Sequence, residues 1–206
     1  MSLLEELNNA YPDATCELVY GTDFELLISV ILSAQCTDKR VNIVTRELFR
    51  IADSPAEFCA LETEKLESLI KSCGLYKNKA ANIKAACKAI VERFGGIVPR
   101  TREELMSLPG VGRKTANVML SVAFGEPAIA VDTHVFRVSH RMGLSDGKTP
   151  DLVEKDLCAA FEPSAYGNVH FLFIHHGRHC CKAQNPDCEN CPVVTYCKEY
   201  NMRTNL

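Results

Sequence analysis

Residues 108–117 combine two glycines with a lysine at the start of a predicted helix, in the order Leu-Pro-Gly-Val-Gly-Arg-Lys-Thr-Ala-Asn. Gly110 and Gly112 lack a Cβ, so the turn can adopt positive φ and bring backbone N–H groups close to an anion. The following helix N-terminus carries a partial positive charge that favours a phosphate. Lys114 adds a primary amine, which is a nucleophile when neutral. The sequence therefore predicts a phosphate-binding helix-hairpin-helix over about 101–124 that carries an amine.

Two other glycine-rich sites are excluded by the neighbouring residues. The helix before the turn begins at Thr101, which forms an S/T-x-x-E capping-box pattern with Glu104, whereas a dinucleotide fingerprint needs a strand there. A P-loop is excluded because Arg113 separates Gly112 from Lys114. A helix–helix turn without a ligand remains open, and so does a lysine that only binds phosphate.

Four cysteines follow near the C-terminus with the spacing Cys181-x6-Cys188-x2-Cys191-x5-Cys197. Four thiols on one compact loop suit one metal centre. Structural zinc sites usually pair two Cys-x-x-Cys knuckles, and this loop has one, so an iron–sulfur cluster with four thiolate ligands is favoured. Zinc remains an alternative, as do disulfides or free thiols. Cys180 has no assigned role, and the preceding histidines are interpreted as buried or surface residues rather than ligands: His175, His176 and His179.

Helical periodicity dominates all 206 residues, and no segment alternates polar and apolar residues as a strand would. The sequence predicts an all-α chain with helices at about 2–10, 23–35, 38–52, 56–60, 63–73, 78–94, 101–107, 113–124, 133–143, 150–161 and 165–179. Asp23 and Thr149-Pro150 read as helix starts. The longest apolar stretch, 26–34, is too short to span a membrane, and no secretory leader is apparent, so we expect a cytoplasmic protein.

The charge distribution is uneven, although the net charge is only −3. Residues 1–38 hold seven acidic residues and no Lys or Arg. Residues 71–114 hold ten basic residues against three acidic ones, a balance of +7 that leads into the hairpin. Basic charge on one face is typical of nucleic-acid binding, so we expect a local basic groove.

With hairpin, lysine and cysteines in one chain, the sequence resembles endonuclease III, the iron–sulfur family of helix-hairpin-helix DNA glycosylases. The similarity spans almost the whole chain, and its most specific segments are 26–35, Gly-Leu-Tyr at 74–76, 108–117, Val-Asp-Thr-His at 131–134 and the cysteine spacing. The resemblance implies a two-lobed α-helical fold, with a six-helix domain at 23–131 and a cluster domain built from 1–22 and 132–206. It also implies one [4Fe-4S] cluster and DNA bound across the cleft between the lobes.

The same resemblance assigns roles to individual residues. Lys114 is expected to be the catalytic nucleophile, and Asp132 the catalytic carboxylate. Gln35 and Leu75 are expected to fill the space that a flipped base leaves, while the hairpin residues bind the DNA backbone: Gly110, Gly112 and Arg113. Local alternatives remain, because Asp132 could simply cap a helix, Leu75 could be a core contact, and Gln35 could be a buried amide. The expected cluster ligands are Cys181, Cys188, Cys191 and Cys197.

The expected function is base-excision repair, in which a bifunctional DNA glycosylase removes oxidised pyrimidines and an abasic-site lyase activity cleaves the strand by β-elimination through a lysine Schiff base. The expected partner is double-stranded DNA with damaged pyrimidines or abasic sites, and we expect a monomer. Lys114 argues against a monofunctional mismatch or uracil glycosylase, since hydrolysis needs only water and a carboxylate. A non-enzymatic DNA-binding or redox-sensing module is the third alternative. The loop at 182–187 departs from the family, whose loop is usually basic, because it also contains Asp187.

Overall fold

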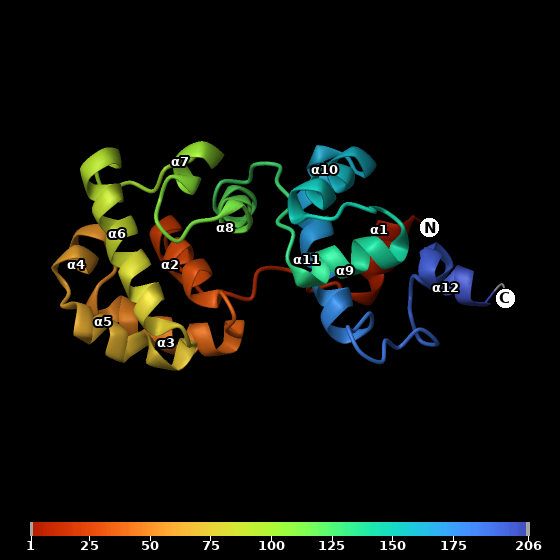
Figure 1. Ribbon diagram of the computed structural model, residues 1–206, viewed down its shortest axis with the longest axis horizontal. Coiled ribbons are helices and arrows are strands. Elements are labelled where there is room, and N and C mark those ends of the chain that lie inside the picture. The colour runs from red at the N-terminus through yellow and green to blue at the C-terminus, as the bar shows by residue number, and fades with distance from the viewer. Residues whose placement is uncertain (1, 205–206) are drawn as a thin grey trace. The chain divides into compact units, whose positions relative to one another are not determined.

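The computed structural model describes residues 2–204, and these contain helices and loops but no β-strand. The all-α prediction is therefore confirmed. The helices, in chain order, are α1 (Leu3–Ala10), α2 (Asp23–Ser33), α3 (Asp38–Ile51), α4 (Pro55–Ala60), α5 (Thr63–Ile70), η1 (Lys71–Cys73), α6 (Tyr76–Phe94), α7 (Arg102–Met106), α8 (Arg113–Val118), η2 (Met119–Ala123), α9 (Thr133–Met142), α10 (Pro150–Ala160), η3 (Pro163–Ala165), α11 (Tyr166–His179), η4 (Val194–Tyr196) and α12 (Lys198–Thr204) (Figure 1).

The chain forms two compact units, Glu17–Gly125 and a terminal unit of Met1–Cys16 with Glu126–Leu206. Residue 1 and residues 205–206, which the expected cluster domain also includes, lie outside the described residues. The expected first domain, 23–131, begins and ends a few residues later than the first unit. The segment after Gly125 groups with the terminal unit because Ile129 and Val131 belong to its apolar core.

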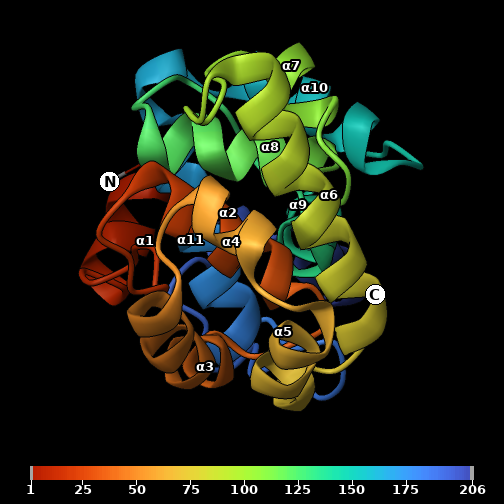
Figure 2. The same cartoon turned by 90° about the vertical axis from the view of Figure 1, so that its left-hand side faces the viewer.

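The Glu17–Gly125 unit is built around α2, whose residues 26–32 are all buried. This segment is apolar on all sides except at Ser29, so the helix must be covered by other helices. The neighbouring α3 is amphipathic and buries Val41, Val44 and Leu48 at the spacing of one helix face. The long helix α6 packs against α2, α4 and α5, as Figure 2 shows. These contacts hold the loops at the ends of α2 and η1.

The terminal unit closes around α9 and α11, which pack against each other. Val135, Val138 and Met142 line one face of α9 and share a core with Leu172 and Phe173 of α11. The core also includes residues of α1, α10 and the loop that carries the four cysteines: Leu7, Val153, Leu157 and Val193. Both termini therefore contribute to one apolar core.

Helix starts follow the predicted capping chemistry. Hydroxyl side chains accept a hydrogen bond from the third helical N–H at six helices: Ser2, Thr22, Thr37, Ser54, Thr101 and Thr149. The predicted starts at Asp23 and Thr149-Pro150 are confirmed. The expected capping box of Thr101 is only half formed, because the Glu104 carboxylate accepts from the Thr101 hydroxyl instead of from its backbone N–H.

Three helix predictions need correction. The segment 63–73 divides into α5 and a 3₁₀ turn, and the segment 113–124 divides into α8 and the π-helical η2. Helix α12 was not predicted, because it buries no residue and so lacks an apolar period. Within residues 2–204, no helix combines the length and apolar character needed to cross a membrane.

Candidate functional site

The hairpin turn is anchored by two buried apolar residues. Leu108 and Val111 are almost fully buried, and the Val111 N–H donates to the Leu108 carbonyl at 3.1 Å. Between them stand Pro109 and Gly110, and Gly110 has a φ of 79°. Proline followed by a residue with positive φ is the signature of a type II turn. The sequence therefore fixes a tight reversal between α7 and α8.

The two hairpin glycines serve different purposes. A Cβ on Gly110 would lie 2.8 Å from the Asn82 Cβ, so both space and backbone angle require glycine there. Gly112 has a φ of −92°, and the expectation of positive φ is wrong at this position. Apart from its own residue and its two chain neighbours, a Cβ on Gly112 would have no atom of the described residues within 4 Å. The folded chain itself thus gives no reason for glycine at 112, and a ligand that approaches the backbone would give one.

Lys114 lies in the first turn of α8 and is exposed. The N-cap of α8 is Gly112, which offers no side chain to cap the helix. Arg113 precedes the lysine, and Arg102 of α7 donates from Nε to Asn117 Oδ1 of α8 at 2.9 Å. This bond ties the two hairpin helices together. The amine therefore stands on the surface at the start of a fixed helix, where substrate can reach it.

Asp132 is the N-cap of α9 in the terminal unit. Its Oδ1 accepts hydrogen bonds from the backbone N–H groups of His134 and Val135, both at 2.8 Å. The capping role that the sequence left open is therefore present. Both capping bonds use Oδ1, so Oδ2 takes no part in the cap. Burial lowers the pKa of the neighbouring His134, although the Asp132 charge opposes this.

Gln35 and Leu75 share an unusual backbone conformation. Their φ angles are 55° and 48°, and within residues 2–204 the only other non-glycine residue with positive φ is Asn185. Such a conformation costs about 1–3 kcal/mol and is concentrated at functional sites. Both side chains are exposed, and Leu75 keeps 56% of its surface accessible. The alternatives of a buried amide for Gln35 and a core contact for Leu75 are therefore wrong.

The burial of Lys79 was not predicted from the sequence. Lys79 is 5% exposed, and its Nζ donates to the carbonyls of Leu32 at 2.8 Å and Cys73 at 2.9 Å. It therefore adds no charge to the surface of the basic 71–114 segment. Lys84 is also engaged with the protein, since its Nζ donates to three carbonyls: Phe58, Cys59 and Leu61. A count of basic residues thus overstates the surface charge that the segment offers to DNA.

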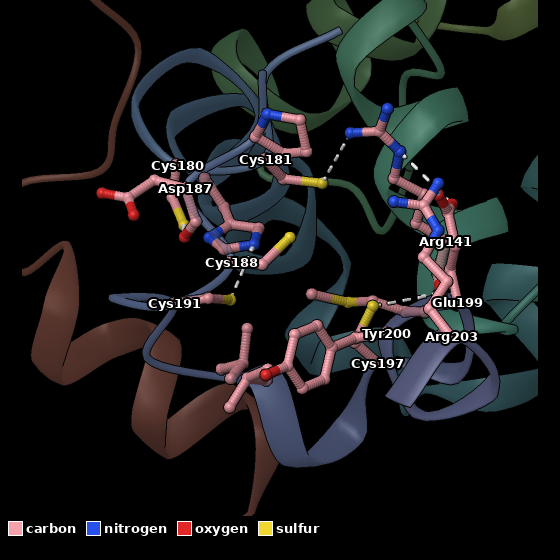
Figure 3. Close-up of a pocket in the computed structure, with 15 residues that line it drawn as sticks. Arg141, Cys180, Cys181, Asp187, Cys188, Cys191, Cys197, Glu199, Tyr200 and Arg203 are labelled. Carbon is pink, nitrogen blue, oxygen red and sulfur yellow. Dashed lines mark hydrogen bonds and ion pairs between the residues drawn. The ribbon is translucent and has the colours of Figure 1, made fainter. Parts of the chain in front are cut away.

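The four predicted cysteine ligands line one pocket in the terminal unit (Figure 3): Cys181, Cys188, Cys191 and Cys197. Their sulfurs converge from a loop that turns back on itself. The pocket also includes His176 and Cys180, which the sequence set aside. Burial lowers the pKa of His176 to about 4, so the ring is neutral, and its Nδ1 lies 3.1 Å from the Tyr11 hydroxyl. Burial raises the pKa of Cys180 to about 12, and this thiol donates to the Asp187 carbonyl.

The arrangement of the sulfurs distinguishes the metal alternatives. A single tetrahedral zinc with Zn–S bonds of about 2.3 Å brings all its ligand atoms within about 4 Å of one another. In the described chain, the one group whose ligand atoms all lie within 4.8 Å is His176, Cys180 and Cys191. The four predicted sulfurs do not form such a close group, yet they border a common pocket. Sulfurs spaced around a shared hollow fit a polynuclear cluster better than one ion.

Two arginines on α9 hold the start of the cysteine loop. Arg137 donates from Nε to the Cys181 carbonyl at 2.9 Å and from Nη2 to the Gly177 carbonyl at 2.8 Å. Arg141 donates from Nη1 to Cys181 Sγ at 3.5 Å and to the Lys182 carbonyl at 2.7 Å. The loop is therefore tied to the helix that Asp132 begins.

Comparison with known proteins gives the class of protein that this fold and these residues define. Residues 28–163 match the family of HhH-GPD superfamily base excision DNA repair proteins. Residues 181–197, from the first predicted ligand to the last, match the iron-sulfur binding domain of endonuclease III. The loop is thus an iron–sulfur binding domain, and the fold is that of a helix-hairpin-helix base excision repair protein.

The full length of the chain matches individual relatives as well. Endonuclease III of Bacillus subtilis (strain 168) is 50% identical over 201 residues, which cover 97% of this chain and 92% of that protein. A solved trapped endonuclease III–DNA covalent intermediate is 50% identical with a TM-score of 0.93, covering 98% of this chain and 95% of that chain. A non-covalent endonuclease III–DNA complex is 49% identical with a TM-score of 0.92 and the same coverage. The chain therefore belongs to the endonuclease III family of DNA glycosylases and abasic-site lyases.

Proposed function

We propose that this base excision repair glycosylase removes oxidised pyrimidines from duplex DNA and then cleaves the strand through an imine on Lys114. The observation that carries the proposal is an exposed amine in the first turn after the hairpin, in a chain of the endonuclease III family. An endonuclease III that is 50% identical to this chain has been solved as a trapped covalent intermediate with DNA, which supports covalent chemistry here. A lysine that only binds phosphate is the competing interpretation.

Lys114 supplies the nucleophile. Its neutral Nζ forms a bond to C1′ of the sugar as the bond between C1′ and the damaged base breaks, and the base leaves with that electron pair. Opening of the sugar ring then gives an imine between Nζ and C1′. Loss of a proton from C2′ expels the 3′ phosphate by β-elimination, and water releases the lysine. The first step needs the neutral form of the Lys114 amine, because only that form is a nucleophile.

Asp132 supplies the carboxylate. Oδ1 holds the start of α9, and Oδ2 is left for the reaction. A carboxylate at this position stabilises positive charge that develops on the sugar as the base departs, and it assists proton transfer from the lysine. One residue therefore serves both the helix and the reaction.

The hairpin backbone holds the DNA. Gly112 has open space where a Cβ would stand, and Gly110 maintains the turn through its positive φ. These features let N–H groups approach a DNA phosphate, while Arg113 adds a charge-assisted contact. Gln35 and Leu75 are exposed on strained turns, where Leu75 inserts into the base stack and the Gln35 amide replaces lost base pairing.

One [4Fe-4S] cluster is held by Cys181, Cys188, Cys191 and Cys197. When bound, the cluster would cross-link a loop that has few apolar side chains of its own. Arg137 and Arg141 connect this loop to α9. We also propose a monomeric state and a cytoplasmic location.

Purified protein mixed with duplex DNA that carries one abasic site tests the proposal. With a metal chelator in the buffer, we expect strand cleavage that leaves a 3′ unsaturated aldehyde. Release of an oxidised pyrimidine without cleavage would indicate a monofunctional glycosylase. Binding without either reaction would indicate a non-enzymatic module. A duplex without damage is the control for contaminating nucleases.

A further inference from the structure

Lys79 joins two turns that are far apart in the sequence. It lies in the first turns of α6, next to α2, and is almost fully buried. Its ammonium donates to the carbonyl of Leu32, 47 residues earlier, and to that of Cys73, six residues earlier. Because both carbonyl oxygens contact one nitrogen atom, the end of α2 and the end of η1 lie next to each other. A single side chain therefore connects the two segments.

Each of these carbonyls ends a helix just before a strained residue. The last carbonyls of a helix have no partner within it, and Leu32 lies in the final turn of α2. The chain then turns through Ser33–Cys36, where the Cys36 N–H donates to the Ser33 carbonyl at 3.0 Å and Gln35 takes a φ of 55°. Cys73 ends η1, and Gly74 and Leu75 follow with φ of 70° and 48°.

Further contacts couple the same two turns. The Lys79 backbone N–H donates to the Leu75 carbonyl at 3.0 Å, so Lys79 contacts the second turn through main chain and side chain. Burial, together with the neighbouring Cys36 thiol, raises the pKa of Cys73 to about 11, which keeps the Cys73 thiol protonated. Among residues 2–204, the groups that face the ammonium are thus two carbonyls and two thiols, without a carboxylate.

Burying a charged lysine in a core costs free energy of solvation that an apolar side chain would not lose. Burial lowers the pKa of Lys79, which shows that its charge loses solvation in the folded protein. A methionine would fill the same space without that loss, and replacing buried charge with apolar residues is often neutral or stabilising. Stability alone therefore does not account for a lysine at this position, whereas fixing two exposed and strained residues relative to each other does.

We propose that Lys79 is a positioning residue that holds Gln35 and Leu75 in one geometry for insertion into duplex DNA. The proposal rests on the role assigned to these two residues under the proposed function. Lys79 is buried and touches no substrate. It acts by satisfying a carbonyl at each of the two helix ends, so that the chain can enter the left-handed conformation at Gln35 and Leu75 in the turns that follow.

The same helix offers a matched control. Lys84 also donates to backbone carbonyls from its ammonium, but its partners lie at the end of α4, at Phe58, Cys59 and Leu61. Lys84→Met removes the same chemistry from α6 and leaves the two strained turns alone. A comparison with Lys79→Met therefore separates two effects: the loss of any buried lysine–carbonyl contact on α6, and the loss of the contacts to the two strained turns.

The test compares two substrates for each variant. An oxidised pyrimidine in a duplex requires extrusion of a paired base, whereas an abasic site in a single strand requires none. For Lys79→Met we expect kcat/KM on the damaged duplex to fall about tenfold or more, since a small misplacement of a contact group can cost up to about a hundredfold. Strand cleavage at the single-stranded abasic site should stay close to that of the unchanged protein, and Lys84→Met should change both substrates alike. Equal losses on both substrates for Lys79→Met, or no loss on either, would overturn the proposal.

Two additions keep the result decisive. If Lys79→Met does not fold, Lys79→Arg retains the charge and the donors but has a planar group that cannot reproduce the ammonium geometry, and it should show the same selective loss. A fluorescent 2-aminopurine opposite the damaged base reports opening of the pair on binding and needs no catalysis. Its signal should fall with Lys79→Met and not with Lys84→Met. If the unchanged protein gives no lyase activity, the proposed function fails, while this fluorescence comparison still decides the role of Lys79.

Discussion

Helices α8 and α9 begin in opposite ways. The N-cap of α8 is Gly112, which has no side chain and leaves the first backbone amides without a side-chain cap. The N-cap of α9 is Asp132, which satisfies two amides with one carboxylate oxygen. Stability alone would favour an acidic cap at both helices. Under the proposed function, the start of α8 is left open for a DNA phosphate, whereas the start of α9 is capped by the carboxylate of the protein itself.

The comparison also explains where each expected catalytic residue stands. Lys114 lies in the first turn of the open helix, and Asp132 is itself the cap of the closed one. An amine at the start of a helix without a side-chain cap is placed to meet a phosphate-bearing substrate, and the two capping hydrogen bonds hold the Asp132 carboxylate in a fixed direction. The proposed roles therefore follow from how each helix begins.

Replacing the Asp132 carboxylate that caps α9 should have the largest effect on activity. Asp132→Asn keeps a capping oxygen but removes the negative charge, so base release should slow by about 10²–10⁴-fold, as expected for lost acid–base or electrostatic help. DNA affinity and the free energy of unfolding should change little. Single-turnover base release, DNA binding and thermal unfolding would be measured together. A loss confined to affinity or to folding would mean that Asp132 is only a cap.

The uncapped start of α8 and the basic segment 71–114 predict that DNA affinity depends strongly on salt. DNA affinity should fall by about a hundredfold between about 50 mM and about 200 mM salt, because several phosphate contacts release counterions. Binding titrations at four salt concentrations give the slope. Affinity that does not depend on salt would contradict phosphate binding at the hairpin, whatever the activity of the enzyme.

Adding a side-chain cap to the start of α8 should weaken DNA binding. Gly112→Asp adds an acidic cap to α8, so the free energy of unfolding should rise by a few tenths of a kcal/mol while DNA affinity falls about tenfold through repulsion of the phosphate. Gly112→Ala separates the charge from the added volume, since its φ of −92° suits alanine. Unchanged affinity in both variants would remove the argument for an approaching phosphate.

The smallest effect on DNA binding is expected from the cysteine loop. Cys188→Ser removes one of four thiolates, so the protein should lose its brown colour and its iron, about four atoms per chain in the unchanged protein. DNA affinity should fall severalfold, and hydrogen exchange should rise in the loop and in α9, which Arg137 and Arg141 connect to it. The Glu17–Gly125 unit should be unaffected. One zinc and no iron in the unchanged protein would refute the cluster.

Local patterns were predictable from the sequence, and long-range contacts were not. The hairpin, the cysteine spacing and the threonine caps depend on residues within one turn or loop, and the structure contains them. Lys79 and Arg141 could not be recognised, because their carbonyl partners lie 47 and 41 residues away. The left-handed conformation of Gln35 and Leu75 was also hidden, since glutamine and leucine carry no signal for positive φ. His176 was dismissed as a structural histidine, and only the fold shows that it lines the cysteine pocket.

Trapping the covalent intermediate tests the central claim most directly. The protein would be mixed with an abasic duplex and borohydride, which reduces an imine to a stable amine, and the attached peptide would be identified by mass spectrometry. We predict one adduct, on Lys114, that disappears with Lys114→Ala and persists with the neighbouring Arg113→Ala. An adduct that forms equally well with folded Lys114→Ala would contradict the assignment of the nucleophile.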